Sequence, residues 1–501
     1  MGLENAANAA EALASGLPAL VWRKVVADSD TPVGAARRLI EPGRGDFLLE
    51  SVEGGEVRGR YSLLGLDPDL VFRASESSAA INHTWKTDKE AFLPCKGDAM
   101  TELRALADRC RIDVPDALPP ALACLVGYFG YETIGLVEDL PRAAPSDLSL
   151  PDMLFVRPTV ILVFDGLSDE LFCIAPIWKA ADPLAGIELA AERIDETLRA
   201  LTQPRPAQPR APANMAEPEL TPVIAPEDYK SLALKAKDYI LAGDIFQVVL
   251  AQRFTCPFEL PPIELYRSLR RVNPSPFLYF LDLPGFAIVG SSPEILVRVR
   301  DDEVTIRPIA GTRPRGANRL EDDANEASLL ADPKECAEHL MLLDLGRNDV
   351  GRVAARGSVE VTDSFTVERY SHVMHIVSNV IGELADDKDA IDALFAGFPA
   401  GTVSGAPKIR ACEIIAELEP ETRGAYAGGV GYFAPDGSVD SCIVLRTAVV
   451  KDGTMHVQAG AGIVADSDPD YELAECRAKA GALIAAAREA VRVASEPGFG
   501  Q

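Results

Sequence analysis

A proline-rich segment divides the chain into two long parts and limits what each part can form. Residues 202–226 read TQPRPAQPRAPANMAEPELTPVIAP and contain seven prolines. Proline lacks a backbone N–H and fixes φ, so this stretch cannot hold a continuous helix. We therefore predict a linker over residues 204–225, between an N-terminal region (1–203) and a C-terminal domain (226–495). The alternative is a long loop within one domain, although loops of that length are uncommon.

Hydrophobic spacing on both sides of this segment predicts a mixture of strands and helices. Strands are expected at residues 154–165 and 170–174, at 244–254, and as a strand–turn–strand over 286–309. Helices are expected at 188–201, 227–242, 322–349 and 471–493, with Gly243 ending the second of them. Because tight turns join the strands and helices are inserted between them, we predict an α+β fold rather than a doubly wound parallel sheet.

The charge balance excludes some partners. The 501 residues include 49 Lys and Arg against 76 Asp and Glu, a net charge of −27. A surface this acidic repels polyphosphate and anionic lipid. We therefore expect neither nucleic acid nor a membrane as a partner. Taken alone, the same charge also argues against a small anionic substrate.

The cysteines and the apolar runs indicate a cytoplasmic protein. No apolar run approaches the roughly 18 residues of a membrane helix, and no basic, apolar leader opens the chain. Nine scattered cysteines without a C-x-x-C pair are typical of reduced thiols.

Two pairs of glutamates are candidate metal ligands. Glu335 and Glu338 lie three residues apart in one predicted helix, and Glu472 and Glu475 do the same in another. Residues at this spacing share a helix face, so each pair can direct two carboxylates to one point. Carboxylate oxygens suit Mg²⁺. Read alone, such a pair is more often a solvated helix face.

Four loops rich in small residues lie near these pairs, at 290–294, 308–316, 398–408 and 458–463. Glycine lets backbone N–H groups approach an anion closely, and a helix N-terminus adds partial positive charge. None of the loops has the spacing of a nucleotide-binding motif. Together with the glutamate pairs, they favour a site for a small anion.

These stretches resemble the chorismate-utilising enzymes and, among them, component I of anthranilate synthase. The resemblance is carried by DIFQVVL (244–250), DPKECAEH (332–339), RYSHVMH (369–375), the 399–408 loop and residues 458–475. It implies largely antiparallel sheets packed as a sandwich with helices outside, preceded by a regulatory α+β region. It also implies that chorismate and ammonia become anthranilate and pyruvate, as a step of tryptophan biosynthesis.

The resemblance assigns roles to individual residues. It implies that Glu335, Glu338, Glu472 and Glu475 hold Mg²⁺ on the ring carboxylate of chorismate. Glu294 would be the general acid for the departing hydroxyl, with His375 assisting elimination and Thr402 positioning by a hydrogen bond. The substrate would contact Ala310, Gly311, Thr312, Tyr426, Arg446, Gly460, Ala461, Gly462 and Lys479. Without the resemblance, His375 would more often be a core histidine.

Two positions separate the nearest relatives. Isochorismate and salicylate synthases have a Lys base where this chain has Gln247, and ammonia needs no such base. Aminodeoxychorismate synthases resemble P-I-K-G-T with a nucleophilic Lys, where this chain has Ala310. Both residues favour anthranilate. A 4-amino-4-deoxychorismate synthase component, or a non-catalytic sensor of tryptophan or chorismate, is the alternative.

The resemblance also implies a partner and an inhibitor. Nothing in the chain resembles a glutaminase, so a separate glutamine amidotransferase subunit is expected to supply ammonia. Tryptophan is expected to bind at Leu49, Glu50, Ser51, Asn273, Pro274, Pro276, Phe277 and Leu278. Phe277 and Leu278 stand where relatives often have Tyr and Met. The alternative is that Glu50 and Ser51 are no more than a strand end, which is the less favoured interpretation.

Overall fold

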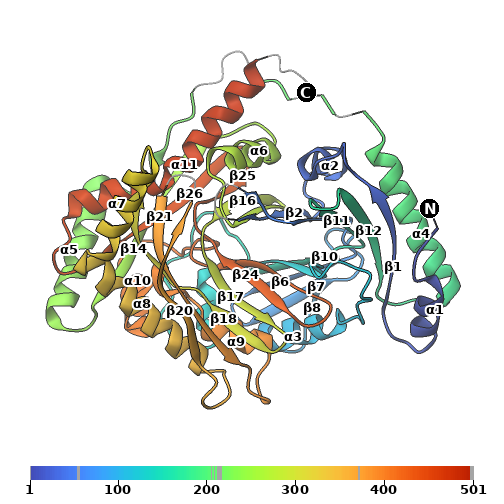
Figure 1. Cartoon of the computed structure of the whole chain (residues 1–501), viewed down its shortest axis with the longest axis horizontal. Coiled ribbons are helices and arrows are strands. Elements are labelled where there is room, and N and C mark those ends of the chain that lie inside the picture. Colours follow the sequence, from blue (N-terminus) through green and yellow to red (C-terminus); the bar gives the residue numbers. More distant parts are fainter. Residues whose placement is uncertain are drawn as a thin grey trace.

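Two large antiparallel sheets face each other, and the longer helices lie on their outer sides (Figure 1). The computed structural model describes residues 2–53, 57–204, 206–207, 209–211, 217–370 and 373–496. Each sheet has twelve strands. This arrangement confirms the predicted α+β sandwich.

The first sheet joins strands from both ends of the chain. Glu50 on β2 lies opposite Leu278 on β15, so segments more than 200 residues apart in sequence are hydrogen-bonded neighbours. In order across the sheet, the strands are β1 (Ala19–Val26), β12 (Glu170–Ile177), β11 (Val160–Asp165), β5 (Tyr61–Leu66), β2 (Asp46–Glu50), β15 (Phe277–Leu283), β16 (Phe286–Ser292), β25 (Thr447–Lys451), β26 (Thr454–Ile463), β14 (Gln247–Pro257) and β13 (Thr221–Pro222), with β22 (Gly405–Ala406) paired to β14.

The second sheet also joins strands from both ends of the chain, because β9 pairs with β23 and places Phe129 opposite Gly429. Its strands are β19 (Ile309–Pro314), β21 (Val373–Glu383), β18 (Glu303–Ile306), β17 (Ile295–Arg300), β24 (Val439–Ile443), β23 (Gly429–Phe433), β9 (Leu125–Phe129), β10 (Met153–Arg157), β6 (Leu70–Ser75), β7 (Ser78–Asn82) and β8 (Leu93–Pro94), with β20 (Glu360–Arg369) paired to β21. A separate two-stranded sheet is formed by β3 (Val52–Glu53) and β4 (Val57–Arg58).

Both sheets therefore cross the predicted linker. The regions 1–203 and 226–495 share one hydrophobic core rather than forming two separate ones. The division at residues 204–225 stays a prediction, and residues 205, 208 and 212–216 lie outside the described part of the chain.

The helices that bear on the site begin with clear local signals. The side chains of Asp332 and Asp468 cap α8 and α11, and each is followed by proline at the first helical position. The helices are α1 (Ala6–Ala14), α2 (Pro32–Leu39), α3 (Ala99–Arg109), α4 (Pro183–Leu201), α5 (Pro226–Ala242), α6 (Pro262–Val272), α7 (Arg319–Leu330), α8 (Pro333–Gly351), α9 (Ala390–Ala396), α10 (Lys408–Leu418) and α11 (Pro469–Ser495), with short 3₁₀ turns η1 (Tyr131–Leu136) and η2 (Gly401–Val403).

Most of the predicted elements are present with small shifts in their ends. Gly243 ends α5 with a φ of +85°, as predicted for a C-terminal cap. The helix predicted over 322–349 is two helices, α7 and α8, because Asp332 is extended and Pro333 begins a new helix. The stretch 286–309 holds three strands rather than two. Among the described residues, no helix has the length and apolar character needed to cross a membrane.

Candidate active site

The predicted general acid, Glu294, is buried between two strands. Glu294 connects β16 to β17 and is only 7% exposed. Burial raises the pKa of its carboxyl to about 8, although a hydrogen bond from Thr402 and the charge of Arg446 oppose the rise. The Thr402 hydroxyl donates to Glu294 Oε2 over 3.1 Å. A carboxyl in this state is protonated at neutral pH and can donate a proton.

His375, on β21, is held by the neighbouring strand β19. Its Nδ1 lies 2.8 Å from the carbonyl oxygen of Gly311 and 3.1 Å from the Thr312 hydroxyl. Because a carbonyl only accepts, Nδ1 carries the proton and Nε2 is left as the acceptor. Burial lowers the pKa of His375, so the ring is neutral at pH 7. The predicted residues of the 310–312 loop and His375 therefore form one unit.

Arg446 offers a positive charge beside this unit. Its backbone has a φ of +47°, a strained conformation for a residue with a side chain. It lies close enough to Glu294 for its charge to lower the pKa of that carboxyl. Within the described part of the chain, the Arg446 guanidinium forms no ion pair or hydrogen bond. A planar cation held this way suits a carboxylate of the substrate.

The Gly460–Gly462 segment supplies backbone groups near Tyr426. It belongs to β26 and pairs with Val249–Ala251 of β14, whereas β25 reaches β26 only over 454–457. In the described structure this segment has no strand on its second edge, which leaves amides of that edge for a ligand. Burial raises the pKa of the Tyr426 phenol, although a hydrogen bond with the Gly460 backbone opposes the rise.

The two glutamate pairs lie on α8 and α11 as predicted, and all four carboxylates already have partners, Glu472 through the Ser467 side chain. Arg313 Nη1 donates to Glu335 Oε1 over 3.1 Å. Gln247 Nε2 donates to Glu338 Oε1 over 3.1 Å, and Lys479 Nζ lies 2.7 Å from Glu475 Oε1. Burial raises the pKa of the fourth, Glu472.

This donor set fits Mg²⁺ in chemistry but is not gathered around a point. Among the described residues, no three His, Cys, Asp or Glu side chains converge closely enough to hold a metal ion. Hard carboxylate oxygens are nevertheless the ligands that Mg²⁺ prefers. Arg313, Gln247 and Lys479 would compete with a metal for the glutamate oxygens that they contact.

The two residues that separate the relatives lie inside the same site. Gln247 is buried at the start of β14, against Gly462, where an added Cβ would lie 2.4 Å from its amide nitrogen. Ala310 is buried on β19, opposite Ile376. Neither side chain can act as a base or a nucleophile.

A cavity of about 730 Å³ between the two sheets contains most of the predicted tryptophan site. Its walls include Leu49, Glu50, Ser51, Pro276, Phe277 and Leu278. Asn273 follows α6, and its amide donates to Ser291 Oγ over 3.3 Å. Pro274 follows Asn273 in the chain and comes two residues before Pro276, where this segment begins to line the cavity. The structure thus brings the two predicted segments together on β2 and β15.

The Glu50 carboxylate is bound from one side by two groups of α6. Arg270 donates to both of its oxygens, at 2.9 and 2.7 Å, and the Tyr266 hydroxyl donates to Oε2 at 2.6 Å. Glu50 therefore links the cavity wall to α6, and its role in binding tryptophan stays a prediction.

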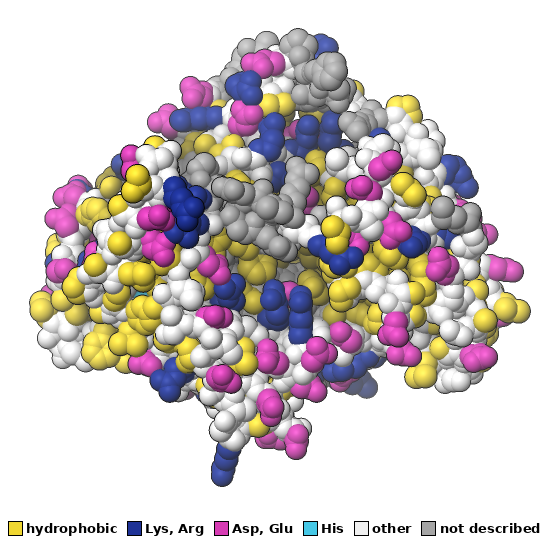
Figure 2. Space-filling model, viewed as in Figure 1, with side chains coloured by type: hydrophobic (Ala, Val, Ile, Leu, Met, Phe, Trp, Pro, Cys, Tyr) yellow, Lys and Arg dark blue, Asp and Glu magenta, His cyan; other side chains and the backbone are white. Residues whose placement is uncertain are grey.

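The charge of this cavity differs from that of the whole chain. Five arginines and three carboxylates line it: Arg60, Arg298, Arg300, Arg307, Arg369, Glu50, Glu368 and Asp440. Figure 2 shows Lys and Arg side chains gathered around the central hollow of this face. The net charge of −27 therefore says little about the interior, because exposed charges are screened within roughly 8 Å at physiological salt.

Several residues of the site carry no sequence signal that singles them out. Arg313 binds Glu335 and also Asp332, at 2.7 Å. The Tyr370 ring packs edge-on against His375 at 5.6 Å. Arg313 lies inside a loop that the sequence marks, but its partner depends on how α8 packs on β19. Ser371 and His372 of the RYSHVMH motif lie outside the described residues.

Comparison with known proteins agrees with this geometry. The anthranilate synthase component 1 of Cereibacter sphaeroides is 53% identical over 488 residues, covering 97% of this chain and 98% of that protein. The protein of the same name from Thermus thermophilus is 47% identical over 93% of this chain and 97% of its own length. The crystal structure of anthranilate synthase component I from Streptococcus pneumoniae superposes with a TM-score of 0.76 at 34% identity, covering 92% and 99% of the two chains.

The model of the family described as chorismate binding enzyme matches residues 47–485, so the chain belongs to the chorismate-binding enzymes. The menaquinone-specific isochorismate synthase of Escherichia coli shares the fold, with a TM-score of 0.69 at 19% identity. Within this class, the chain belongs to the anthranilate synthase component 1 family. The resemblance found in the sequence is thereby confirmed.

Proposed function

We propose that this chain converts chorismate and ammonia into anthranilate, pyruvate and water, as component I of an anthranilate synthase. The observation that carries the proposal is Gln247, whose amide is bound to Glu338 at the position where a water-adding relative has a Lys base. Ammonia is itself a nucleophile and needs no base there. Ala310 likewise leaves no nucleophile for the route to 4-amino-4-deoxychorismate.

The residues of the site divide the work between two steps. In the first, ammonia attacks ring C2 while the C4 hydroxyl leaves, and the raised pKa of Glu294 keeps its carboxyl protonated to donate to that hydroxyl. In the second, pyruvate is eliminated and the ring becomes aromatic, assisted by neutral His375. Arg446, Tyr426 and the Gly460–Gly462 backbone would hold the enolpyruvyl carboxylate.

Magnesium belongs to the proposal through Glu335, Glu338, Glu472 and Glu475. When bound, the ion would polarise the ring carboxylate and neutralise clustered acids that are costly to bring together without a cation. Lys479, which also donates to the Gly460 carbonyl at 2.9 Å, would place positive charge at the same end of the substrate.

The proposal includes a glutamine amidotransferase partner as the source of ammonia, because the name component 1 of the relatives implies a second component. Free ammonium at high pH should replace it. All nine cysteines are free in the structure, as a reducing compartment allows, and a cytoplasmic location is part of the proposal.

One assay tests the reaction. Purified chain is mixed with chorismate, Mg²⁺ and ammonium, and the fluorescence of anthranilate is followed. A product that is instead isochorismate or 4-amino-4-deoxychorismate would refute the argument from Gln247 and Ala310. No turnover at all would favour a non-catalytic sensor.

Tryptophan as a feedback inhibitor is tested in the same assay. Ser51→Phe adds a ring at the wall of the cavity and should relieve inhibition while leaving the uninhibited kcat unchanged. Leu167→Phe, at an exposed turn between β11 and β12, is the control. Unchanged inhibition of the Ser51 variant would place the inhibitor elsewhere.

A further inference from the structure

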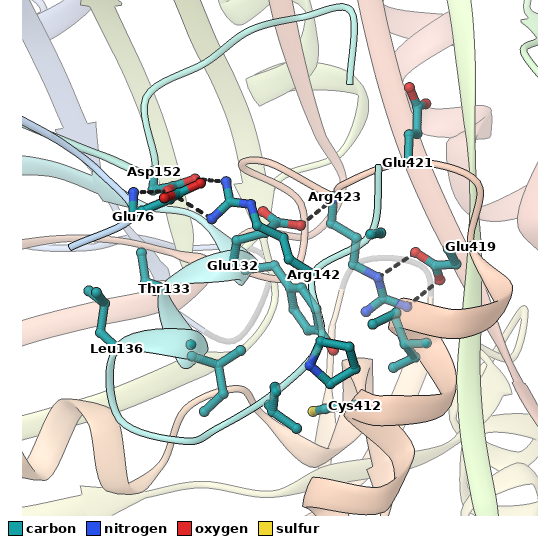
Figure 3. A pocket seen from close by; sticks show the side chains of 18 of the residues that line it. Glu76, Glu132, Thr133, Leu136, Arg142, Asp152, Cys412, Glu419, Glu421 and Arg423 are labelled. Atoms are coloured by element: carbon teal, nitrogen blue, oxygen red, sulfur yellow. Dashed lines mark hydrogen bonds and ion pairs between the residues drawn. The ribbon is translucent and has the colours of Figure 1, made fainter. Parts of the chain in front are cut away.

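A buried ion pair behind the active site connects three of its parts. Arg423 and Glu419 lie just after α10, their side chains are 1% and 2% exposed, and Arg423 Nη2 is 2.6 Å from Glu419 Oε1. The second contact, from Nε to Oε2, is 2.8 Å. Figure 3 shows the pair at the edge of a cavity of about 270 Å³, with Glu132 close by.

The remaining donors of Arg423 reach the backbone of two different segments. Nη1 donates to the Val403 carbonyl and Nη2 to the Val249 carbonyl, each over 2.7 Å. Glu419 Oε1 also accepts the N–H of Ala251, at 2.8 Å. The pair therefore joins the η2 turn, whose Thr402 contacts Glu294, to β14, which begins with Gln247.

The third part is Tyr426. The Arg423 guanidinium lies close to two aromatic rings, 4.6 Å from the centre of Tyr131 and 5.6 Å from that of Tyr426. Glu132 fixes the turn that leads to Tyr426, because it accepts the backbone N–H groups of Arg423 and Gly424 at 2.6 and 3.0 Å. The guanidinium is thus held by hydrogen bonds to Glu419 and to two backbone carbonyls, with two aromatic rings nearby.

We propose that the Arg423–Glu419 pair is a positioning device, which holds Thr402, Gln247 and Tyr426 in the one arrangement that turns over chorismate. Neither side chain contacts the reacting atoms. A lysine cannot replace the arginine, because only a planar fork reaches a carboxylate and two carbonyls at once. This proposal rests on the proposed function, since it is measured by anthranilate formation.

A merely structural role makes a different prediction. Replacing a buried ion pair by apolar residues of similar volume is often neutral for stability. Here the replacement also leaves the Val403 and Val249 carbonyls and the Ala251 N–H without their partners, which costs stability. If the pair served the fold alone, Arg423→Met combined with Glu419→Leu would therefore lower the melting temperature, but the folded protein would keep its kcat. If the pair positions the site, the double variant stays folded and loses turnover, because its backbone partners are no longer fixed.

The experiment compares this double variant with a matched control. The control is Arg253→Met with Glu421→Leu, an ion pair at 2.8 Å between β14 and the segment after α10, with no contact to Thr402 or Tyr426 among the described residues. For the Arg423 double variant we expect kcat to fall about 100-fold and the KM for chorismate to change less than about fivefold, since small misplacements of this kind affect the chemical step. The control keeps wild-type kcat.

Each result of this experiment either supports or overturns the proposed positioning role. A folded double variant with wild-type kcat overturns the proposal, and so does an equal loss in the control. If the double variant does not fold, Arg423→Lys and Glu419→Gln replace it, because each nearly keeps the volume. Unchanged kcat in a folded single variant then overturns the proposal, and a fall in kcat without a fall in melting temperature supports it. Failure of the wild-type chain to make anthranilate would instead refute the proposed function.

Discussion

The site has two halves, which differ in whether their side chains already lie in the arrangement that the proposed chemistry needs. We call the half around Glu294 and His375 the prepared half, and the half around the glutamates of α8 and α11 the less prepared half. Around Glu294 and His375, the hydrogen bonds needed for proton transfer are already made, and the groups are dry. Around the glutamates of α8 and α11, Glu472 is buried, and the other three carboxylates are partly exposed and are occupied by Arg313, Gln247 and Lys479.

The difference follows from the cost of charge. A protonated carboxyl and a neutral imidazole can be buried cheaply, so these two residues can be fixed before the substrate arrives. Four carboxylates cannot be gathered without a cation, because their mutual repulsion and desolvation have no compensation. Neighbouring donors occupy three of the glutamates instead, and the proposed Mg²⁺ would compete with them.

Removing one carboxylate charge from the less prepared half should have the largest effect. Glu338→Gln keeps the shape and still accepts from Gln247, so the fold should be unchanged. Turnover should fall by at least about a thousandfold, because a catalytic metal supplies several kcal/mol of transition-state stabilisation. Melting temperature and anthranilate fluorescence are measured together, and near-normal activity would exclude Glu338 as a metal ligand.

In the prepared half, Glu294→Gln should lower kcat by about a thousandfold, within the usual range for a general acid. The KM for chorismate should change little, because Arg446 and Tyr426 are untouched. Binding is measured by isothermal titration of chorismate against the inactive variant. A large loss of binding with unchanged kcat would show that Glu294 holds the substrate and donates no proton.

The sequence predicts much of this comparison where the signal is local. The helical repeat places each glutamate pair on one face, as predicted. Asp-Pro at 332–333 and at 468–469 starts α8 and α11, a local signal that the predicted helices over 322–349 and 471–493 did not use. Gly243 ends α5 for the same local reason. The acid Glu294 stands out only through the family resemblance, because its burial comes from strands distant in sequence.

What the sequence leaves out depends on contacts between distant segments. No local pattern shows that β2 pairs with β15, or that both sheets cross the proline-rich stretch. Arg423 follows a helix end as an ordinary charged residue would, and its burial results from packing against β14 and the η2 turn. Pairings of this kind are set by the whole core and not by spacing.

A change to the hydrogen bond on Glu294 should have a moderate effect with a clear pH signature. Wild-type kcat should be present below about pH 8 and be lost as pH rises through the Glu294 pKa, because only the protonated carboxyl donates. Thr402 stabilises the ionised form, so Thr402→Val should move this alkaline limb to higher pH. It should also lower kcat about tenfold, the value of one hydrogen bond to a charged group.

The measurement is kcat from pH 6 to 10, with Ser404→Ala as the control. Ser404 lies in the same loop and donates to the Ala400 carbonyl at 2.8 Å, away from Glu294. A limb that moves to lower pH in the Thr402 variant would show that another group titrates there.

The smallest expected effect tests whether the cations next to the glutamates of α8 and α11 weaken Mg²⁺ binding. Arg313→Gln removes a cation that competes with Mg²⁺ for Glu335, so the magnesium affinity of the chorismate-free protein should rise about two- to fivefold, the value of one partly exposed ion pair. Isothermal titration with Mg²⁺ measures this without turnover. Arg319→Gln is the control, because Arg319 is exposed on α7 and its nearest carboxylate is Asp323. Weaker magnesium binding in the Arg313 variant would mean that the arginine orients Glu335 for the metal rather than competing with it, and the glutamate half would then be as prepared as the acid–base half.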